Sequence, residues 1–143
     1  MRVMVMLKSS ENSEAGLMPN EERSTEMSQF NEELVKAGVR LAAEGLQPSS
    51  QGKRVRFEGG KAKVIDGPFT EAKELIAGFW LWQVRDMDEA VEWVKRIPNP
   101  EAHTGEIEIR RVYELEDLGD EFTPAARAQE ERLRQQLESD PNR

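Results

Sequence analysis

The segment from residue 75 to 84, LIAGFWLWQV, is apolar on both faces when it is laid out as a strand. Successive side chains of a strand point to opposite faces of its sheet. One face then carries Leu75, Ala77, Phe79 and Leu81, and the other carries Ile76, Trp80 and Trp82. A strand with one face in water should alternate between apolar and polar residues instead. We therefore expect both faces of this strand to be covered in the folded protein.

The rest of the chain predicts the elements around this strand. Alternating residues indicate strands over 2–8, 39–48 and 106–113, and helical spacing indicates helices from Pro19 to the Gly38 stop and from the Asp86 cap to Pro98. Residues 9–20 are read as a polar loop. A hairpin over 53–65 turns at Gly59-Gly60, since glycine supplies the positive φ of tight turns. Without the hairpin, the order is the βαββαβ of an α+β, ferredoxin-like fold.

Both helices of a ferredoxin-like sheet cover the same face, so the second face of strand 75–84 needs another cover. The simplest cover is a second copy of the sheet, related by two-fold symmetry. We therefore predict a homodimer that pairs into a dimeric α+β barrel. The alternative cover is the C-terminal segment. After Asp117 the composition becomes polar and helical from Thr123-Pro124, which predicts a domain over 1–118 and a tail over 119–143.

Composition excludes several classes of function. The net charge of −8 opposes binding to nucleic acid or to anionic membranes. The absence of cysteine removes disulfides and thiolate chemistry, and the presence of a single histidine, His103, argues against a zinc site. No cofactor fingerprint or phosphate loop is present, so we expect no cofactor and no metal. The apolar run from Val3 to Leu7 is too short for a secretory signal, which predicts a cytoplasmic protein.

The predicted second face of the sheet combines apolar and charged residues. If Val3 and Val5 face the helices, Lys8 lies on the second face, and Ile107 and Ile109 packing inward would leave charged neighbours there as well. The residues expected to line a partly apolar cavity are Lys8, Trp80, Trp82, Glu106, Glu108 and Arg110. A mixed cavity of this kind is typical of a small-molecule site.

Residues 65–74, IDGPFTEAKE, come directly before the apolar strand. A turn alone would explain Asp66, Gly67 and Pro68, and Thr70 could cap a short helical turn. The longer string DGPFTEAKELIAGFWLWQV, together with EGLQPS at 44–49 and GEIEIRRV at 105–112, resembles the YCII-related family in its DGPF subgroup. The resemblance spans residues 1–113.

That resemblance implies a dimeric α+β barrel with a polar cleft between the sheet and its partner. Activity in the family is generally unassigned, and members often occur beside genes for extracytoplasmic-function sigma factors. Some relatives carry a His–Asp pair near the first strand–helix connection, which has no histidine here. The last strand has Arg111 where the family usually has proline.

Two functions stay open, with a purely structural dimer as a third. In the first, Asp66 is a general base, Lys8 stabilises negative charge, and Glu106 or Glu108 is a second carboxylate acting on a small carbonyl or carboxylate compound. In the second, the protein is a non-catalytic ligand-binding or regulatory dimer, linked to sigma-factor signalling. An enzyme should bring Asp66 close to Lys8, or bury an acid in a water-accessible pocket.

Overall fold

The computed structural model describes residues 1–98 and 105–140, so the predicted loop residue His103 lies outside the described residues. The chain divides into two compact units, Met1–Val112 and Tyr113–Arg143. No helix in the described part of the chain is both long and apolar enough to span a bilayer.

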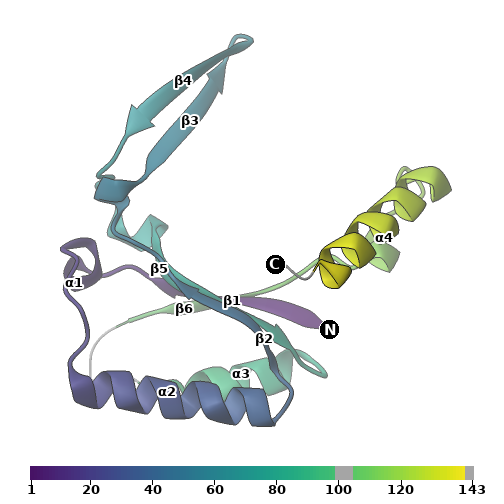
Figure 1. The fold of residues 1–143 in the computed structure, drawn as a ribbon. Coiled ribbons are helices and arrows are strands. Elements are labelled where there is room, and N and C mark those ends of the chain that lie inside the picture. Colours follow the sequence, from purple (N-terminus) through teal and green to yellow (C-terminus); the bar gives the residue numbers. More distant parts are fainter. Residues whose placement is uncertain (99–104, 141–143) are drawn as a thin grey trace. The chain divides into compact units, whose positions relative to one another are not determined.

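The first unit is built on a four-stranded antiparallel sheet. Its strands are β1 (Arg2–Lys8), β2 (Arg40–Gly45), β5 (Ile76–Gln83) and β6 (Ile107–Arg111), in the order β2-β5-β1-β6. The helices α2 (Glu21–Lys36) and α3 (Met87–Lys95) both cover one face of this sheet (Figure 1). These elements confirm the predicted α+β fold, while its pairing into a dimer stays a prediction.

Local capping signals fix where the helices begin and end. The side chain of Asn20 accepts a hydrogen bond from the Arg23 amide at the start of α2, and Gly38, with φ +71°, follows its last turn. Asp86 caps α3 in the same way, as predicted. The predicted loop at 9–20 contains a short helix, α1 (Glu11–Glu14), which a capping box between Ser10 and Ser13 holds.

The hydrophobic core lies between the sheet and α2 and α3. Val3 and Val5 are fully buried and stand directly opposite Trp82 and Trp80 on β5. Directly opposite residues of an antiparallel pair share a face. Phe30 of α2 makes an edge contact with the Trp80 ring, with 6.0 Å between the ring centroids. Both indoles therefore fill the space beneath the helices.

This packing corrects one sequence-based prediction. Trp80 and Trp82 were expected on the second face of the sheet, beside Lys8, and that placement is wrong. The two indoles have large apolar surfaces, which are buried against Phe30. Phe79 and Leu81 alternate with them along β5 and therefore lie on the second face. Because β5 is apolar on both faces, its period alone cannot tell which face meets the helices.

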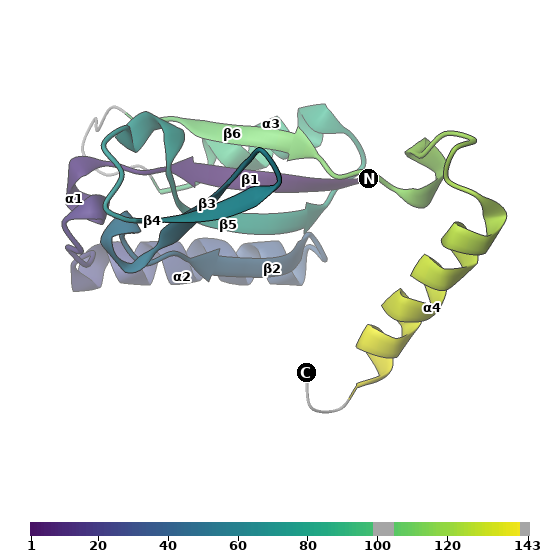
Figure 2. The same cartoon turned by 90° about the horizontal axis from the view of Figure 1, so that it is seen from above.

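The strands β3 (Lys53–Glu58) and β4 (Lys61–Asp66) form a separate hairpin that turns at Gly59 and Gly60. Both glycines have positive φ, +54° and +79°, as a two-residue hairpin turn requires. The hairpin stands on the side of the sheet away from α2 and α3 (Figures 1 and 2). Short 3₁₀ turns flank it: η1 (Ser49–Gln51) before β3 and η2 (Ala72–Glu74) after β4.

The second unit consists of a 3₁₀ turn, η3 (Leu115–Asp117), and one helix, α4 (Pro124–Ser139). Thr123 caps α4 by accepting a hydrogen bond from the Ala126 amide, and Pro124 occupies the first helical turn. The helix therefore begins where the sequence predicts it. No side chain of α4 is buried among the described residues.

Candidate functional site

The face of the sheet opposite α2 and α3 is apolar at its centre. We call it the open face and define its centre by two cross-strand pairs, Met4 with Leu81 and Met6 with Phe79. All four side chains are partly exposed. Exposed apolar patches of this kind mark interaction or ligand sites more often than single surface residues do.

Three charged side chains border this centre at β6 and the end of β1. Glu108 and Arg110 stand opposite Met6 and Met4 and so share the open face. The Nζ of Lys8 lies 3.2 Å from Glu108 Oε1, and Arg110 Nη1 lies 3.6 Å from Glu108 Oε2. The Lys8 side chain is 22% exposed and that of Glu108 is 38% exposed. The structure therefore brings together three of the residues singled out from the sequence, which we call the charged trio.

The electrostatics of the charged trio favour binding over proton transfer. Hydrogen bonding from Lys8, and then its positive charge, lowers the pKa of Glu108 below its ordinary value of 4.5. A carboxylate with a lowered pKa stays ionised and accepts protons poorly near neutral pH. Two cations beside one carboxylate also leave one positive charge in excess, which suits an anionic ligand. Glu106, just before β6, is exposed, and its backbone carbonyl accepts a hydrogen bond from the Lys8 amide.

Asp66 lies outside the charged trio. It ends β4, stands opposite Lys53 in the hairpin register, and forms an ion pair with that lysine. Its side chain is 75% exposed. Lys8 is bonded instead to Glu108, and no charged side chain is buried among the described residues. Counting outward from the Gly59-Gly60 turn would have identified Lys53 as the partner of Asp66.

The residues after Asp66 dock onto an earlier loop at the root of the hairpin. The amide of Gly67 donates to the Gly52 carbonyl, and the amide of Phe69 donates to Ser49 Oγ, both at 3.0 Å. A Cβ on Gly67 would lie only 1.8 Å from the Ser49 carbonyl oxygen, so only glycine fits there. The Gly67–Pro68 peptide bond is cis.

Two further side chains secure this root, and one of them could not be predicted from the sequence. Glu14 of α1 accepts hydrogen bonds from both the amide and the hydroxyl of Ser49. The Arg54 guanidinium lies over the Phe69 ring, 3.9 Å from its centroid. Glu14 is 35 residues from Ser49, and no local pattern relates the two. Gly67 and Phe69 of the DGPF motif thus hold the hairpin against the loop that contains Ser49.

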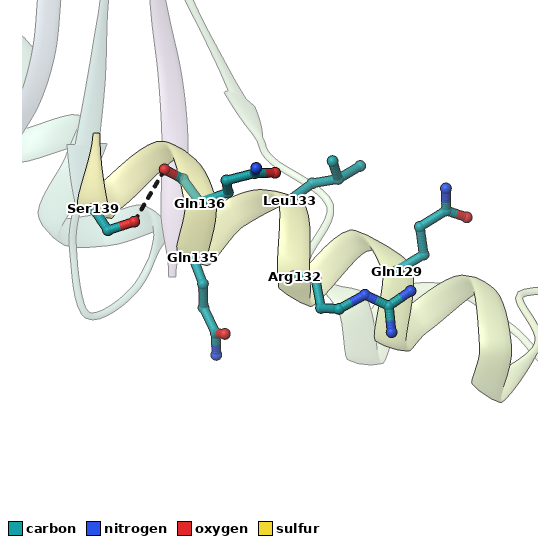
Figure 3. A pocket seen from close by; sticks show the side chains of 6 residues that line it. All are labelled: Gln129, Arg132, Leu133, Gln135, Gln136 and Ser139. Atoms are coloured by element: carbon teal, nitrogen blue, oxygen red, sulfur yellow. Dashed lines mark hydrogen bonds between the residues drawn. The ribbon is translucent and has the colours of Figure 1, made fainter. Parts of the chain in front are cut away.

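Hollows along α4 offer no comparable site. One of them is lined by Gln129, Arg132, Leu133, Gln135, Gln136 and Ser139, which all belong to this one helix (Figure 3). A ligand pocket normally has walls from several elements that converge on the ligand. In the part of the chain that the structure describes, no cluster of three His, Cys, Asp or Glu side chains is arranged to hold a metal ion.

Comparison with known proteins identifies relatives of the chain. Residues 1–116 match the family described as the YCII-related domain. Over 85 residues the chain is 32% identical to an uncharacterized protein of Rhizobium meliloti (strain 1021), and this alignment covers 59% of the chain and 68% of that protein. Residues 1–116, which match the family, contain the whole sheet, the hairpin and the charged trio.

Proposed function

Because the chain belongs to the YCII-related domain family, we propose that it acts as a homodimer of the DGPF subgroup that binds a small carboxylate or carbonyl compound. In this proposal two sheets pack through their open faces and form a dimeric α+β barrel. The ligand lies beside the interface, against the charged trio. The observation that carries the proposal is the position of Lys8, Glu108 and Arg110 at the border of an apolar sheet face.

The dimer is supported by the apolar centre of the open face. Since α2 and α3 cover the other face, Met4, Met6, Phe79 and Leu81 lose contact with water only when something packs on their side of the sheet. Burying apolar area contributes about 25 cal/mol per Å², so a second copy that covers this centre gains stability from it. Sedimentation of the wild-type protein at micromolar concentration should give the mass of two chains.

The ligand class follows from the charge of the trio. Lys8 and Arg110 both lie next to Glu108, so the group is positive by one charge. A small carboxylate would accept hydrogen bonds from the two cations, and charge-assisted bonds of this kind are stronger than neutral ones. The apolar side chains beside the trio would contact the carbon skeleton of the ligand.

A thermal-shift screen of small carboxylates and carbonyl compounds tests this ligand class. We expect hits to raise the Tm of the wild type and to bind at least ten-fold more weakly to Lys8→Met. The matched control is Lys36→Met, which removes the same charge from an exposed i,i+4 pair with Glu32 on α2. Equal affinity of the wild type and Lys8→Met for every hit would refute the proposed role of the trio.

Acid–base catalysis with Asp66 as the base and Lys8 as its partner is the alternative. The ion pair of Asp66 with Lys53 is exposed, which gives the role of a general base little support. A regulatory dimer linked to sigma-factor signalling would need only binding, without turnover. Asp66→Asn separates the two, because asparagine keeps the turn geometry and removes the charge. If Asp66 is the catalytic base, Asp66→Asn should reduce turnover by about 10²-fold or more. We expect instead that Asp66→Asn leaves the binding of the screened hits unchanged.

A further inference from the structure

The β3–β4 hairpin, which we call the arm, is amphipathic. Its register pairs Val55 with Val64 and Phe57 with Ala62, so these four side chains form one apolar face. The exposed fractions are 81% for Phe57, 59% for Val64 and 52% for Val55. The opposite face is basic and carries Arg54, Arg56, Lys61 and Lys63 together with Glu58.

An arm of this composition is not expected to stand alone in water. A two-stranded hairpin is marginally stable by itself and normally needs a third strand or a packed surface. The root of this arm is nevertheless tightly fixed, because Gly67 and Phe69 are hydrogen-bonded to the loop that contains Ser49 and Gly52. A fixed root and an uncovered apolar face together indicate a surface prepared for a partner.

Position and charge identify that partner as a second copy of the chain. The arm stands on the side of the sheet away from α2 and α3, which is the side that the second copy would occupy (Figures 1 and 2). Residues 53–66 contain five cations and two carboxylates, a net charge of +3. Since the whole chain carries −8, the remainder carries −11. Opposite net charges of this size favour the approach of the arm to a second copy at long range, while the contact itself is left to the apolar face.

We infer that each arm lies across the other protomer of the dimer, with Val55, Phe57, Ala62 and Val64 packed on the surface of that protomer and the basic face in water. The inference rests on the proposed dimer and adds to it a second contact, outside the sheet-to-sheet interface. Phe57 is its central side chain, and large buried aromatic side chains often carry a large share of binding energy at interfaces.

Site-directed crosslinking tests the arm, because the chain has no cysteine and a single one can be introduced anywhere. Ala62→Cys places a thiol on the apolar face, and the matched control Lys63→Cys places it on the basic face of the same strand. Each variant is prepared in two forms, a normal form and a form labelled with heavy nitrogen. Both forms are labelled with a maleimide benzophenone, mixed so that dimers contain one chain of each, and irradiated. We expect normal-to-heavy crosslinks from Ala62→Cys, and at least five-fold fewer from Lys63→Cys.

Sedimentation separates the failure of the arm from the failure of the dimer. A wild-type protein of single-chain mass would overturn both. A dimer in which Ala62→Cys crosslinks only within its own chain, or no more than Lys63→Cys does, would overturn the arm and leave the dimer standing. As a second measurement, we expect Phe57→Ser to raise the dimer dissociation constant about ten-fold or more, and an unchanged constant would contradict the inference.

Discussion

Replacing Gly67 with alanine tests whether the DGPF motif anchors the hairpin. The added Cβ would lie 1.8 Å from the Ser49 carbonyl oxygen and 2.8 Å from its carbonyl carbon. Real Cβ contacts stay beyond 3.0 Å, so the two backbone segments must separate by about 1.2 Å. A side chain could rotate away from such a contact, but a backbone carbonyl held in a turn cannot.

The cost of Gly67→Ala combines overpacking with weakened hydrogen bonds. Overpacking costs about 1–3 kcal/mol, and the bonds from the amides of Gly67 and Phe69 contribute about 1 kcal/mol each. We therefore expect a loss of about 2–4 kcal/mol in the free energy of unfolding. In a chain of this length that loss lowers Tm by about 6–16 °C.

Thermal melting and hydrogen exchange measure this effect together. If the root opens without global unfolding, the amides of Gly67 and Phe69 should still lose protection from exchange. Gly45→Ala is the matched control, since no atom lies within 4 Å of the position of its Cβ. A Gly67→Ala protein with the Tm and the exchange of the wild type would refute the anchoring role of the motif.

Three further predictions follow from the core, the charged trio and the C-terminal unit. Asn31→Ala removes the Oδ1 that accepts the Trp80 indole N–H at 2.8 Å, so a chemical-denaturation curve should show a loss of about 1–3 kcal/mol. Because the folded pKa of Glu108 is lowered, its contribution to stability is present above 4.5 and is lost as the pH falls below that value. Melting from pH 7 to 3 should therefore show a steeper decrease for the wild type than for Glu108→Gln. Truncation after Leu118 should lower Tm by less than about 10 °C, and a larger decrease would show that residues 119–143 cover the core or an interface.

Local signals in the sequence predicted the elements, because caps and turns depend on adjacent residues. Asp86 and Thr123 begin helices, and Gly59-Gly60 turns the hairpin, as expected from residue type alone. The short helix α1 was missed because its capping box joins two serines, Ser10 and Ser13, in a stretch without apolar spacing. No hydrophobic period was present there to detect.

The site was harder to predict, because it depends on pairing between distant strands. Lys8, Glu108 and Arg110 could be grouped because Val3 and Val5 of β1 and Ile107 and Ile109 of β6 lie toward the helices, as expected from the sequence. The side of the sheet on which Trp80 lies could not be deduced, since its strand is apolar on both faces and only the pairing with Val5 decides it. The backbone of Gly67 lies close to the Ser49 carbonyl. No pattern of residue types in the sequence predicts such a contact between two distant backbone segments.

The strand order β2-β5-β1-β6 has a consequence for how the chain folds. Each neighbouring pair in this sheet joins strands that are not consecutive, so β1 must wait for β5 and β6, more than 60 residues downstream, before it gains a partner. Closing such long loops slows folding relative to proteins with local contacts. On the ribosome, β1 and β2 would be exposed as unpaired edges until residues 76–83 emerge. The early chain is then most vulnerable to aggregation during synthesis, when the apolar β1 has no neighbour to cover it.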